Sequence, residues 1–428
     1  MQGFKSVLYC GTVLALAGGS AVSAQEIVMP YSETAIIVEA PATIQQTNTK
    51  SGRLATRLKQ AEKRLAEDVG DFSKSYNDFK SKLSNDYGLS YSMDVTVMGQ
   101  KGVPNAGKTA TQSIYAPTVS WQMFNDDTFG SGTIDFSYTA VRYWGNNGEK
   151  IGNKLYLANS INDFTSRSNT FDQLSYTQTL FDNQLAILIG QYPLYDFDGT
   201  EYDSNQQSNF INYALSQNAS STYPTAGLGS YVQYNPTSEI SITAGFQNAQ
   251  NPSANVITTK DFGKKRFTTF GSVSWSPTVK GMGTGQYSLL VYNQPSVEAQ
   301  PGNSVGWSLN MSQNLNEKWG VFMRANAATG DAMPIKQSYV LGGVYNNPLN
   351  RNPLDQIGFA VAYNKVNKGY YDSTEKMRNF ETVVETYWAF GVTQFLTITP
   401  DVQLFIHPAS KEDRKFGTVF SLRGTIMF

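Results

Sequence analysis

The side chains best suited to binding chemistry lie in one acidic and aromatic segment, residues 195–203, with the sequence YDFDGTEYD. A tyrosine ring can stack on the C–H face of a sugar, and a neighbouring carboxylate can accept hydrogen bonds from its hydroxyl groups. Clustered carboxylates also suit calcium, but the spacing here has no calcium-loop signature. We therefore interpret the segment as a candidate contact site for sugars or similar polar solutes, and we predict no metal site.

Enzymatic chemistry has little support, because the chain contains 1 His and 1 Cys. A serine hydrolase needs a His beside a Ser or an Asp. His407 is the only His in the sequence, and Asp401 is near it only through the alternation of one strand. Because Cys10 is the only Cys in the sequence, a disulfide framework and a cysteine zinc site are excluded. We predict that the protein is not an enzyme and has no catalytic residues and no cofactor.

From residue 87 onwards, apolar and polar residues alternate with a period of two, which is typical of β-strands. At 380–392, for example, Val384 and Trp388 lie opposite Glu381 and Glu385. Four such segments place these polar side chains together on one face: Arg324, Glu381, Glu385, Tyr387, Asp401, Gln403 and Arg423. The sixteen predicted strands are 88–99, 112–124, 130–144, 171–181, 184–192, 227–235, 239–247, 267–276, 285–293, 304–313, 318–328, 338–345, 355–366, 380–392, 396–407 and 416–428. Two-faced strands fit both a soluble sandwich and a membrane barrel.

The connections between these strands distinguish the two folds. Tight turns such as 125–127 and 181–183 alternate with long polar loops such as 145–170 and 193–226. Short turns at one rim and long loops at the other are typical of an outer-membrane barrel. Lipid offers no hydrogen bonds, so such a sheet must close on itself. We predict an all-β transmembrane barrel of about sixteen antiparallel strands over residues 87–428, in contact with outer-membrane lipid.

A barrel of this size encloses a water-filled lumen rather than a packed core. The seven polar side chains listed above are then pore-lining candidates, and opposed charges across a pore orient water and polar solutes. The alternative is that each residue only keeps the lumen wet. The loop at 193–226 is long enough to be functional. Folded inward, it would narrow the pore through Asp196, Asp198, Glu201 and Asp203; otherwise it would cap the outer mouth.

The N-terminal residues predict export and a separate helix. Residues 1–24 combine Lys5, an apolar run and small residues ending at Ala24, the pattern of a secretory signal peptide. Residues 25–50 are interpreted as a flexible tether. Residues 51–86 carry apolar side chains at near-heptad spacing, which favours a coiled coil joining subunits in the periplasm. A helix folded against the rest of the chain and a peptidoglycan-binding segment are the alternatives.

The composition agrees with a two-faced barrel. Charged residues make up 16% and aromatic residues 13% of the chain, yet its mean hydropathy is −0.35. An apolar exterior averaged with a neutral polar interior gives such a value. The charge balance, 33 Lys+Arg against 34 Asp+Glu, argues against a nucleic-acid partner. The chain ends in Phe428 on an alternating strand, which resembles the assembly signal of bacterial outer-membrane proteins.

Three stretches carry a more specific resemblance. They are 172–224, with Asp172-Gln173-Leu174 and Ile189-Gly190-Gln191; 347–359, with the sequence NPLNRNPLDQIGF; and 381–408, with the sequence ETVVETY followed by LTITPDVQ. In these stretches the chain resembles the carbohydrate-selective porins of Gram-negative outer membranes. The resemblance implies a sixteen-stranded channel for passive diffusion of sugars across the outer membrane.

The resemblance also bears on individual positions. Arg351, Asp355, Glu381, Glu385 and Asp401 stand where the family usually has like residues. Arg351 and Asp355 fall in a predicted turn, where an ion pair fixing the turn is the expected role. Gln191 replaces a Lys that is common in the family, and the 51–86 helix is not universal there. The alternative function is a general or non-sugar porin that also tethers the outer membrane to the cell wall through its N-terminal helix.

Overall fold

The computed structural model describes residues 71–126, 128–259, 262–371 and 376–428. The predicted signal peptide at 1–24, the tether at 25–50 and the first part of the 51–86 helix lie outside these described residues. They therefore stay predictions.

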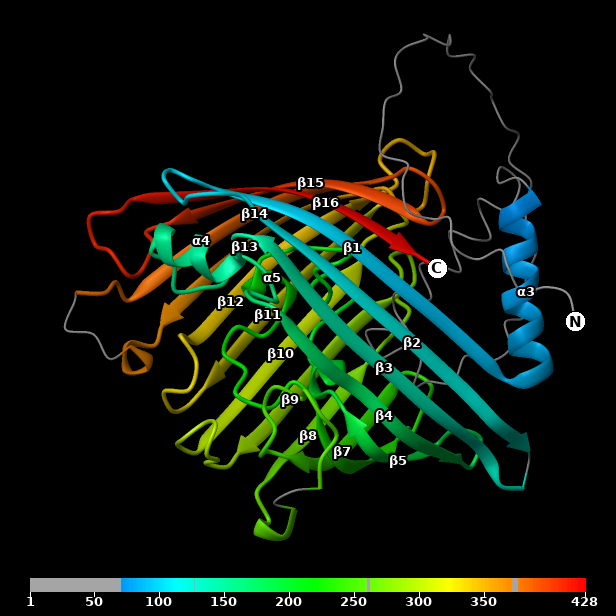
Figure 1. The fold of residues 1–428 in the computed structure, drawn as a ribbon. Helices are drawn as coiled ribbons and strands as arrows, with labels where there is room; N and C mark the ends of the chain where they lie inside the picture. Colours follow the sequence, from blue (N-terminus) through cyan, green and yellow to red (C-terminus); the bar gives the residue numbers. More distant parts are fainter. Residues whose placement is uncertain (1–70, 127, 260–261, 372–375) are drawn as a thin grey trace, which may run out of the picture. The chain divides into compact units, whose positions relative to one another are not determined.

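The described chain forms a closed barrel of sixteen antiparallel strands, each paired with its neighbours in sequence (Figure 1). This confirms the predicted fold class. The strands are β1 (Leu89–Val103), β2 (Ala110–Asp126), β3 (Gly130–Gly145), β4 (Ser168–Leu180), β5 (Leu185–Tyr192), β6 (Gly227–Tyr234), β7 (Ile240–Asn248), β8 (Phe267–Trp275), β9 (Gly285–Gln294), β10 (Ser304–Asn314), β11 (Trp319–Ala328), β12 (Ile335–Asn346), β13 (Gln356–Val366), β14 (Phe380–Gly391), β15 (Leu396–Ile406) and β16 (Phe416–Met427).

Pairing of the first and last strands closes the barrel. β1 and β16 run antiparallel from Asp94 opposite Met427 to Val103 opposite Thr418. The terminal residue extends this pairing, because Phe428 N–H donates to the Met93 carbonyl at 3.1 Å. Closure leaves no strand edge without a partner, which is the condition for a sheet that crosses lipid.

The two rims of the barrel differ in their connections. At one rim, which we call the short-turn rim, β4 and β5 are joined by a tight turn in which Phe181, Asp182 and Asn183 have φ of 55, 51 and 67. At the other, the long-loop rim, the connections include residues 146–167 and 193–226. This asymmetry matches the predicted alternation of turns and loops.

The described residues also form helices and 3-10 turns. They are α3 (Asp71–Tyr87), α4 (Gly148–Leu155) and α5 (Tyr213–Ser216), with the 3-10 turns η1 (Leu194–Phe197), η2 (Phe262–Lys264) and η3 (Lys368–Tyr370). α3 leads into β1 at the short-turn rim through Gly88, whose φ is 66. A Cβ at Gly88 would lie 2.2 Å from the Gln122 carbonyl oxygen, so this connection requires glycine. Among the described helices, none combines the length and apolarity needed to cross a membrane.

Burial alternates along the strands with a period of two. On β16, the outward-facing Phe420 and Leu422 are 50% and 59% exposed. Arg423, the residue after Leu422, faces inward and is 1% exposed. Exposed apolar side chains thus cover the outer face, where lipid is expected, and polar side chains point inward.

Candidate channel and its constriction

Two long loops fold into the barrel and contact the inner face of its wall. The first, residues 146–167, contains α4; the second, residues 193–226, contains η1 and α5. Ile161 in the first loop and Phe210 and Asn212 in the second are each 0% exposed. We call these segments the first and second inward loops. The sequence left open whether 193–226 narrows the lumen or caps its mouth, and the structure places it inside.

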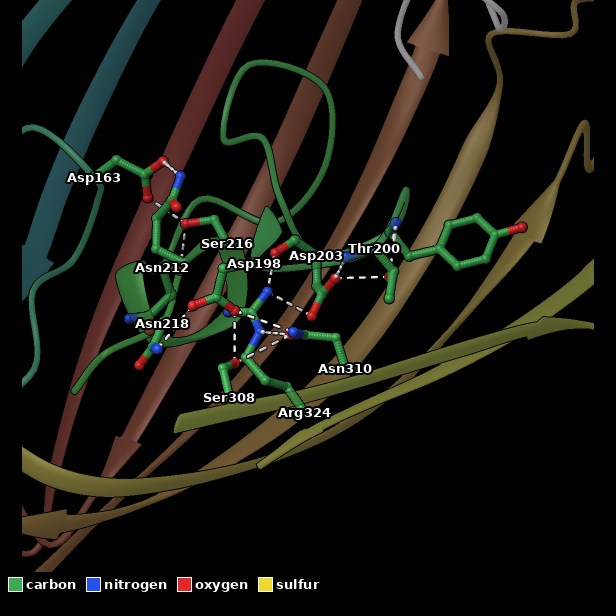
Figure 2. A network of polar contacts seen from close by, with 12 residues as sticks. Asp163, Asp198, Thr200, Asp203, Asn212, Ser216, Asn218, Ser308, Asn310 and Arg324 are labelled. Atoms are coloured by element: carbon green, nitrogen blue, oxygen red, sulfur yellow. Dashed lines mark hydrogen bonds and ion pairs between the residues drawn. The ribbon is translucent and has the colours of Figure 1, made fainter. Parts of the chain in front are cut away.

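A buried ion pair fastens the second inward loop to β11. The Arg324 guanidinium lies 2.5 Å from the Asp203 carboxylate, and both side chains are 0% exposed. Arg324 also donates to the Asp203 carbonyl oxygen and, from Nε, to Asn310 on β10 at 3.1 Å. The Asp203 carboxylate accepts in turn from the backbone and hydroxyl of Thr200 at 2.6 and 2.7 Å (Figure 2). The pair therefore both shapes the loop and anchors it.

Asp198 is the second anchor of the same loop. Its Oδ1 accepts hydrogen bonds from Ser308 at 2.6 Å and Asn310 at 3.1 Å on β10. Its Oδ2 accepts from Asn218 and Tyr223 of the loop itself, both at 2.8 Å (Figure 2 shows the first of these). Burial, followed by the charge of Asp198, raises the pKa of Tyr223 well above its usual value, so the phenol stays protonated and donates.

Glu381 on β14 holds the first inward loop. Its carboxylate accepts backbone hydrogen bonds from Ala158 and Asn159 at 2.9 Å each. It also accepts from the Ala409 N–H at 3.0 Å, in the loop between β15 and β16. One buried side chain therefore satisfies three backbone donors from two separate loops, which water cannot reach there.

Glu385 lies four residues further along β14, on the same face, and does the same for the second inward loop. It accepts from the Ile211 N–H at 2.5 Å and the Asn212 N–H at 2.9 Å. One buried side chain thereby satisfies two backbone donors of the loop. These hydrogen bonds fix the position of α5, which begins one residue later.

Arg423 and Gln403 complete the fastening on β16 and β15. Arg423 donates to the Gln206 carbonyl and, at 2.8 Å, to the Asn209 carbonyl of the second inward loop. Gln403 donates to the Ile161 carbonyl of the first inward loop at 3.0 Å. Both inward loops are thus bonded to the same stretch of wall.

Tyr387 and Asp401 lie within this buried region. Tyr387 donates to Gln356 at 2.5 Å, and its ring meets Phe210 of the second inward loop edge to face at 4.9 Å. Asp401 is close enough to Glu385 to interact with it electrostatically.

The two inward loops also bond to each other. Asp163 of the first loop accepts from the Ser216 hydroxyl, and from Gln217 at 3.0 Å (Figure 2). Asn159 donates to the Asn212 side chain at 2.6 Å. Together the loops form one body that fills part of the lumen along β10 to β16.

A cavity of about 1010 Å³ lies beside the two inward loops. Its lining comes from β1 to β4, from both inward loops, from α3 at the short-turn rim, and from residues 333–335 and Tyr370 near the long-loop rim. The lining is rich in Ser, Thr, Asn and Gln, and among the described residues its charged groups are Asp94, Asp163, Asp172, Asp196 and Lys80. The cavity can therefore hold water and polar solutes along the barrel.

The residues predicted from the sequence differ in whether they line the cavity or face the barrel wall. Asp196 lines the cavity. Asp198 and Asp203 are 3% and 0% exposed and face the wall, while Glu201 lies 3.4 Å from the Asn314 amide. The seven candidates on strands face inward but are covered by the inward loops, at 2% exposed or less: Arg324, Glu381, Glu385, Tyr387, Asp401, Gln403 and Arg423. Their direct contact with a permeating solute stays a prediction.

Sequence reasoning missed most of the charged residues that line the cavity. Asp94 could have been found, because it alternates with Met93, Val95 and Val97 in a predicted strand. Asp163 gave no such signal, since its place depends on how the first inward loop folds.

Arg351 and Asp355 lie in the turn between β12 and β13 and form an ion pair of 2.9 Å. Asp355 also accepts from the Gly391 N–H at 2.7 Å, and Arg351 donates to the Gly391 carbonyl at 2.8 Å. The guanidinium stacks 3.7 Å from the Phe390 ring centroid. The pair thus ties this turn to the end of β14.

We expect Arg351→Ala to lower the free energy of unfolding by roughly 1–3 kcal/mol, because the buried Asp355 carboxylate loses its cation. The measurement is the urea midpoint of the folded band on unheated SDS gels. Arg351→Lys, which retains the charge but loses the stacked, forked geometry, should fall between the wild type and alanine. Equal midpoints for wild type and alanine would show that the pair does not stabilise the turn.

Over the part of the chain that the structure describes, no three or more His, Cys, Asp or Glu side chains are grouped so that they could hold a metal ion.

Comparison with known proteins extends these observations. Residues 132–428 match the family described as carbohydrate-selective porin, OprB family. The chain is 43% identical to porin AaxA of Chlamydia abortus over 368 residues, 84% of this chain and 81% of that one. It is 36% identical to porin AaxA of Chlamydia trachomatis serovar A, covering 82% of this chain and 80% of that one.

Among solved structures, the high-pH structure of Pseudomonas putida OprB resembles this fold with a TM-score of 0.69. The likeness covers 82% of this chain and 97% of the other at 17% sequence identity. At that identity the likeness bears on the fold.

Proposed function

Because this chain belongs to the OprB family of carbohydrate-selective porins, we propose that it lets small hydrophilic solutes, sugars among them, diffuse passively across the outer membrane. Its family places it among outer-membrane porins, which are channels rather than enzymes. The choice of solute is the part that this chain's own residues must support.

The observation that carries the proposal is the cavity of about 1010 Å³, whose lining is rich in Ser, Thr, Asn and Gln. Its lining residues come from the short-turn rim, the barrel wall and the long-loop rim, so a solute can follow hydroxyl and amide groups along the barrel. Hydroxyl and amide groups on β1 to β4 can replace the hydrogen bonds that a sugar loses with water. The inward loops narrow the path and hold it in one shape.

Aromatic rings favour sugars among the polar solutes. Tyr91, Tyr138, Tyr195 and Tyr213 line the cavity together with the carboxylates Asp172 and Asp196. This pairing of rings with acceptors is the chemistry that the acidic and aromatic segment 195–203 predicted.

Planar bilayers containing the purified protein test the proposal. We expect open-channel currents, reduced in a saturable way by glucose and maltose, because an occupied narrow pore conducts fewer ions. Swelling of loaded liposomes should be faster for sugars than for non-sugar solutes of equal size. Absence of conductance would refute a pore; equal swelling for both solute classes, without current block, would favour the general porin.

We also propose that the short-turn rim faces the periplasm, with residues 51–86 on that side, and that signal cleavage follows Ala24. Near-heptad spacing supports assembly of subunits through 51–86, and a peptidoglycan contact by 25–86 is the alternative. Deleting residues 51–70 should reduce the oligomer size in detergent if the coil joins subunits. An unchanged size, with loss of binding to purified peptidoglycan, would favour the tether.

A further inference from the structure

α3 takes part in the channel itself. Five of its residues, Asn77, Lys80, Ser81, Ser84 and Asn85, line the cavity alongside the strands and inward loops. They recur at steps of three, one, three and one, which is one face of a helix. The polar face of α3 is therefore turned towards the space through which a solute would pass.

Several contacts hold α3 in this place. The Tyr76 ring meets Phe395, in the turn between β14 and β15, edge to face at 5.8 Å. The Ser90 hydroxyl of β1 donates to Ser84 at 3.4 Å. At the end of the helix, Gly88 N–H donates to the Ser84 carbonyl at 2.9 Å, which fixes the connection to β1. The helix is thus held through Tyr76 in its first half and through Ser84 at its C-terminal end.

Lys80 is the charged residue on this face. Its ammonium lies 5.4 Å from the Tyr91 ring centroid and 5.6 Å from that of Tyr76. It interacts electrostatically with Asp94 on β1, which also lines the cavity. Within the described residues, the other charged lining groups are carboxylates, so Lys80 supplies the positive charge of the lining.

We propose that α3 forms one side of the channel entrance at the short-turn rim, and that Lys80 is a specificity-determining residue there, opposing the entry of cations. This inference rests on the proposed function, because it assigns a selectivity element to the same channel. The field of one charge extends only about 8–10 Å at physiological salt. The field of Lys80 can therefore act on an ion in a narrow entrance beside it. A charge on the opposite side of α3 is too far from the entrance to affect the ion.

Lys82 provides a matched control. It has the same side chain, stands on the same helix, is exposed and does not belong to the cavity lining. The proposed cleavage after Ala24 removes Cys10, so the mature protein carries no other thiol. We expect a bulky uncharged thiosulfonate reagent to reduce the conductance of Lys80→Cys by roughly half, since the reagent occupies the entrance. The same reagent should leave the conductance of Lys82→Cys unchanged.

Charge substitution tests selectivity separately from bulk. Lys80→Glu should raise the cation-to-anion permeability ratio, measured from the reversal potential in a salt gradient, by roughly threefold, and Lys80→Gln should fall between it and the wild type. Lys82→Glu should shift the ratio little. The differences should diminish as the salt concentration rises, because screening weakens the field.

The outcomes separate this inference from the function on which it rests. If the wild type conducts but position 80 behaves like position 82 in both experiments, α3 is not part of the entrance and the inference is wrong. If the wild type does not conduct, the proposed pore itself fails. A folded band that shifts on heating for each variant excludes misfolding as the cause.

Discussion

Arg324→Ala should increase the single-channel conductance and lower the stability of the barrel, the largest effects that we expect from one substitution. Arg324 and Asp203 are both 0% exposed, so alanine leaves a carboxylate buried without its cation. Breaking a buried pair in this way costs about 3–5 kcal/mol. The second inward loop loses its ion-pair attachment to β11 and can move out of the cavity, which widens the path for ions.

The double variant Arg324→Ala/Asp203→Ala tests this reason. Removing both charges avoids the unpaired carboxylate, so the double variant should be more stable than Arg324→Ala, although its loop also lacks the ion pair to β11. Conductance and stability therefore separate: we expect both variants to conduct more than the wild type, and the single variant to unfold at a lower urea concentration.

Arg142→Ala is the control for removing an arginine as such. Arg142 on β3 bonds to backbone carbonyls of Val141 and Ser168 and touches neither inward loop through these bonds. We expect its conductance to equal that of the wild type. A wild-type conductance for Arg324→Ala, in protein shown to be folded, would mean that this ion pair does not set the width of the channel.

The strands were predictable because their signal is local. Alternation within a dozen residues defines a strand, and the predicted 416–428 and 267–276 differ from β16 and β8 by one residue. The end of β1 was missed: the prediction stopped at 99, while β1 continues to Val103. Lys101 pairs with the exposed Phe420 and so lies on the outer face. Its charge interrupts the apolar pattern of that face near the long-loop rim, although the strand itself continues.

The constriction was less predictable because its contacts are distant in sequence. Alternation puts Glu381 and Glu385 on the inward face, and no local pattern shows that a loop covers them. Glu381 accepts a hydrogen bond from the N–H group of Ala158, which is 223 residues away in the chain. The same holds for Asp203 and Arg324, 121 residues apart. Acidity and length indicated that the loop at 193–226 was functional, but which carboxylates face water and which face the wall is settled by packing.

Glu381→Gln should loosen the long-loop rim without removing any bulk. The carboxylate accepts three backbone N–H groups with two oxygens: Oε1 from Asn159, and Oε2 from Ala158 and Ala409. An amide has one accepting oxygen, so at least one buried N–H group faces an NH2 group and loses its partner. Each buried donor left unsatisfied costs about 1–3 kcal/mol.

The affected segments are the first inward loop and the β15–β16 loop, so we expect faster proteolysis there and noisier single-channel currents. Glu149→Gln is the matched control: Glu149 lies in the first turn of α4 in the same inward loop and is exposed to solvent. It should cleave and conduct like the wild type. Because Glu381→Gln leaves Arg324 and Asp203 in place, the mean conductance should change less than in Arg324→Ala. If instead the current stays quiet and the loop resists protease, the hydrogen bonds to Glu381 do not hold the rim, and the contacts between the two inward loops must be sufficient to do so.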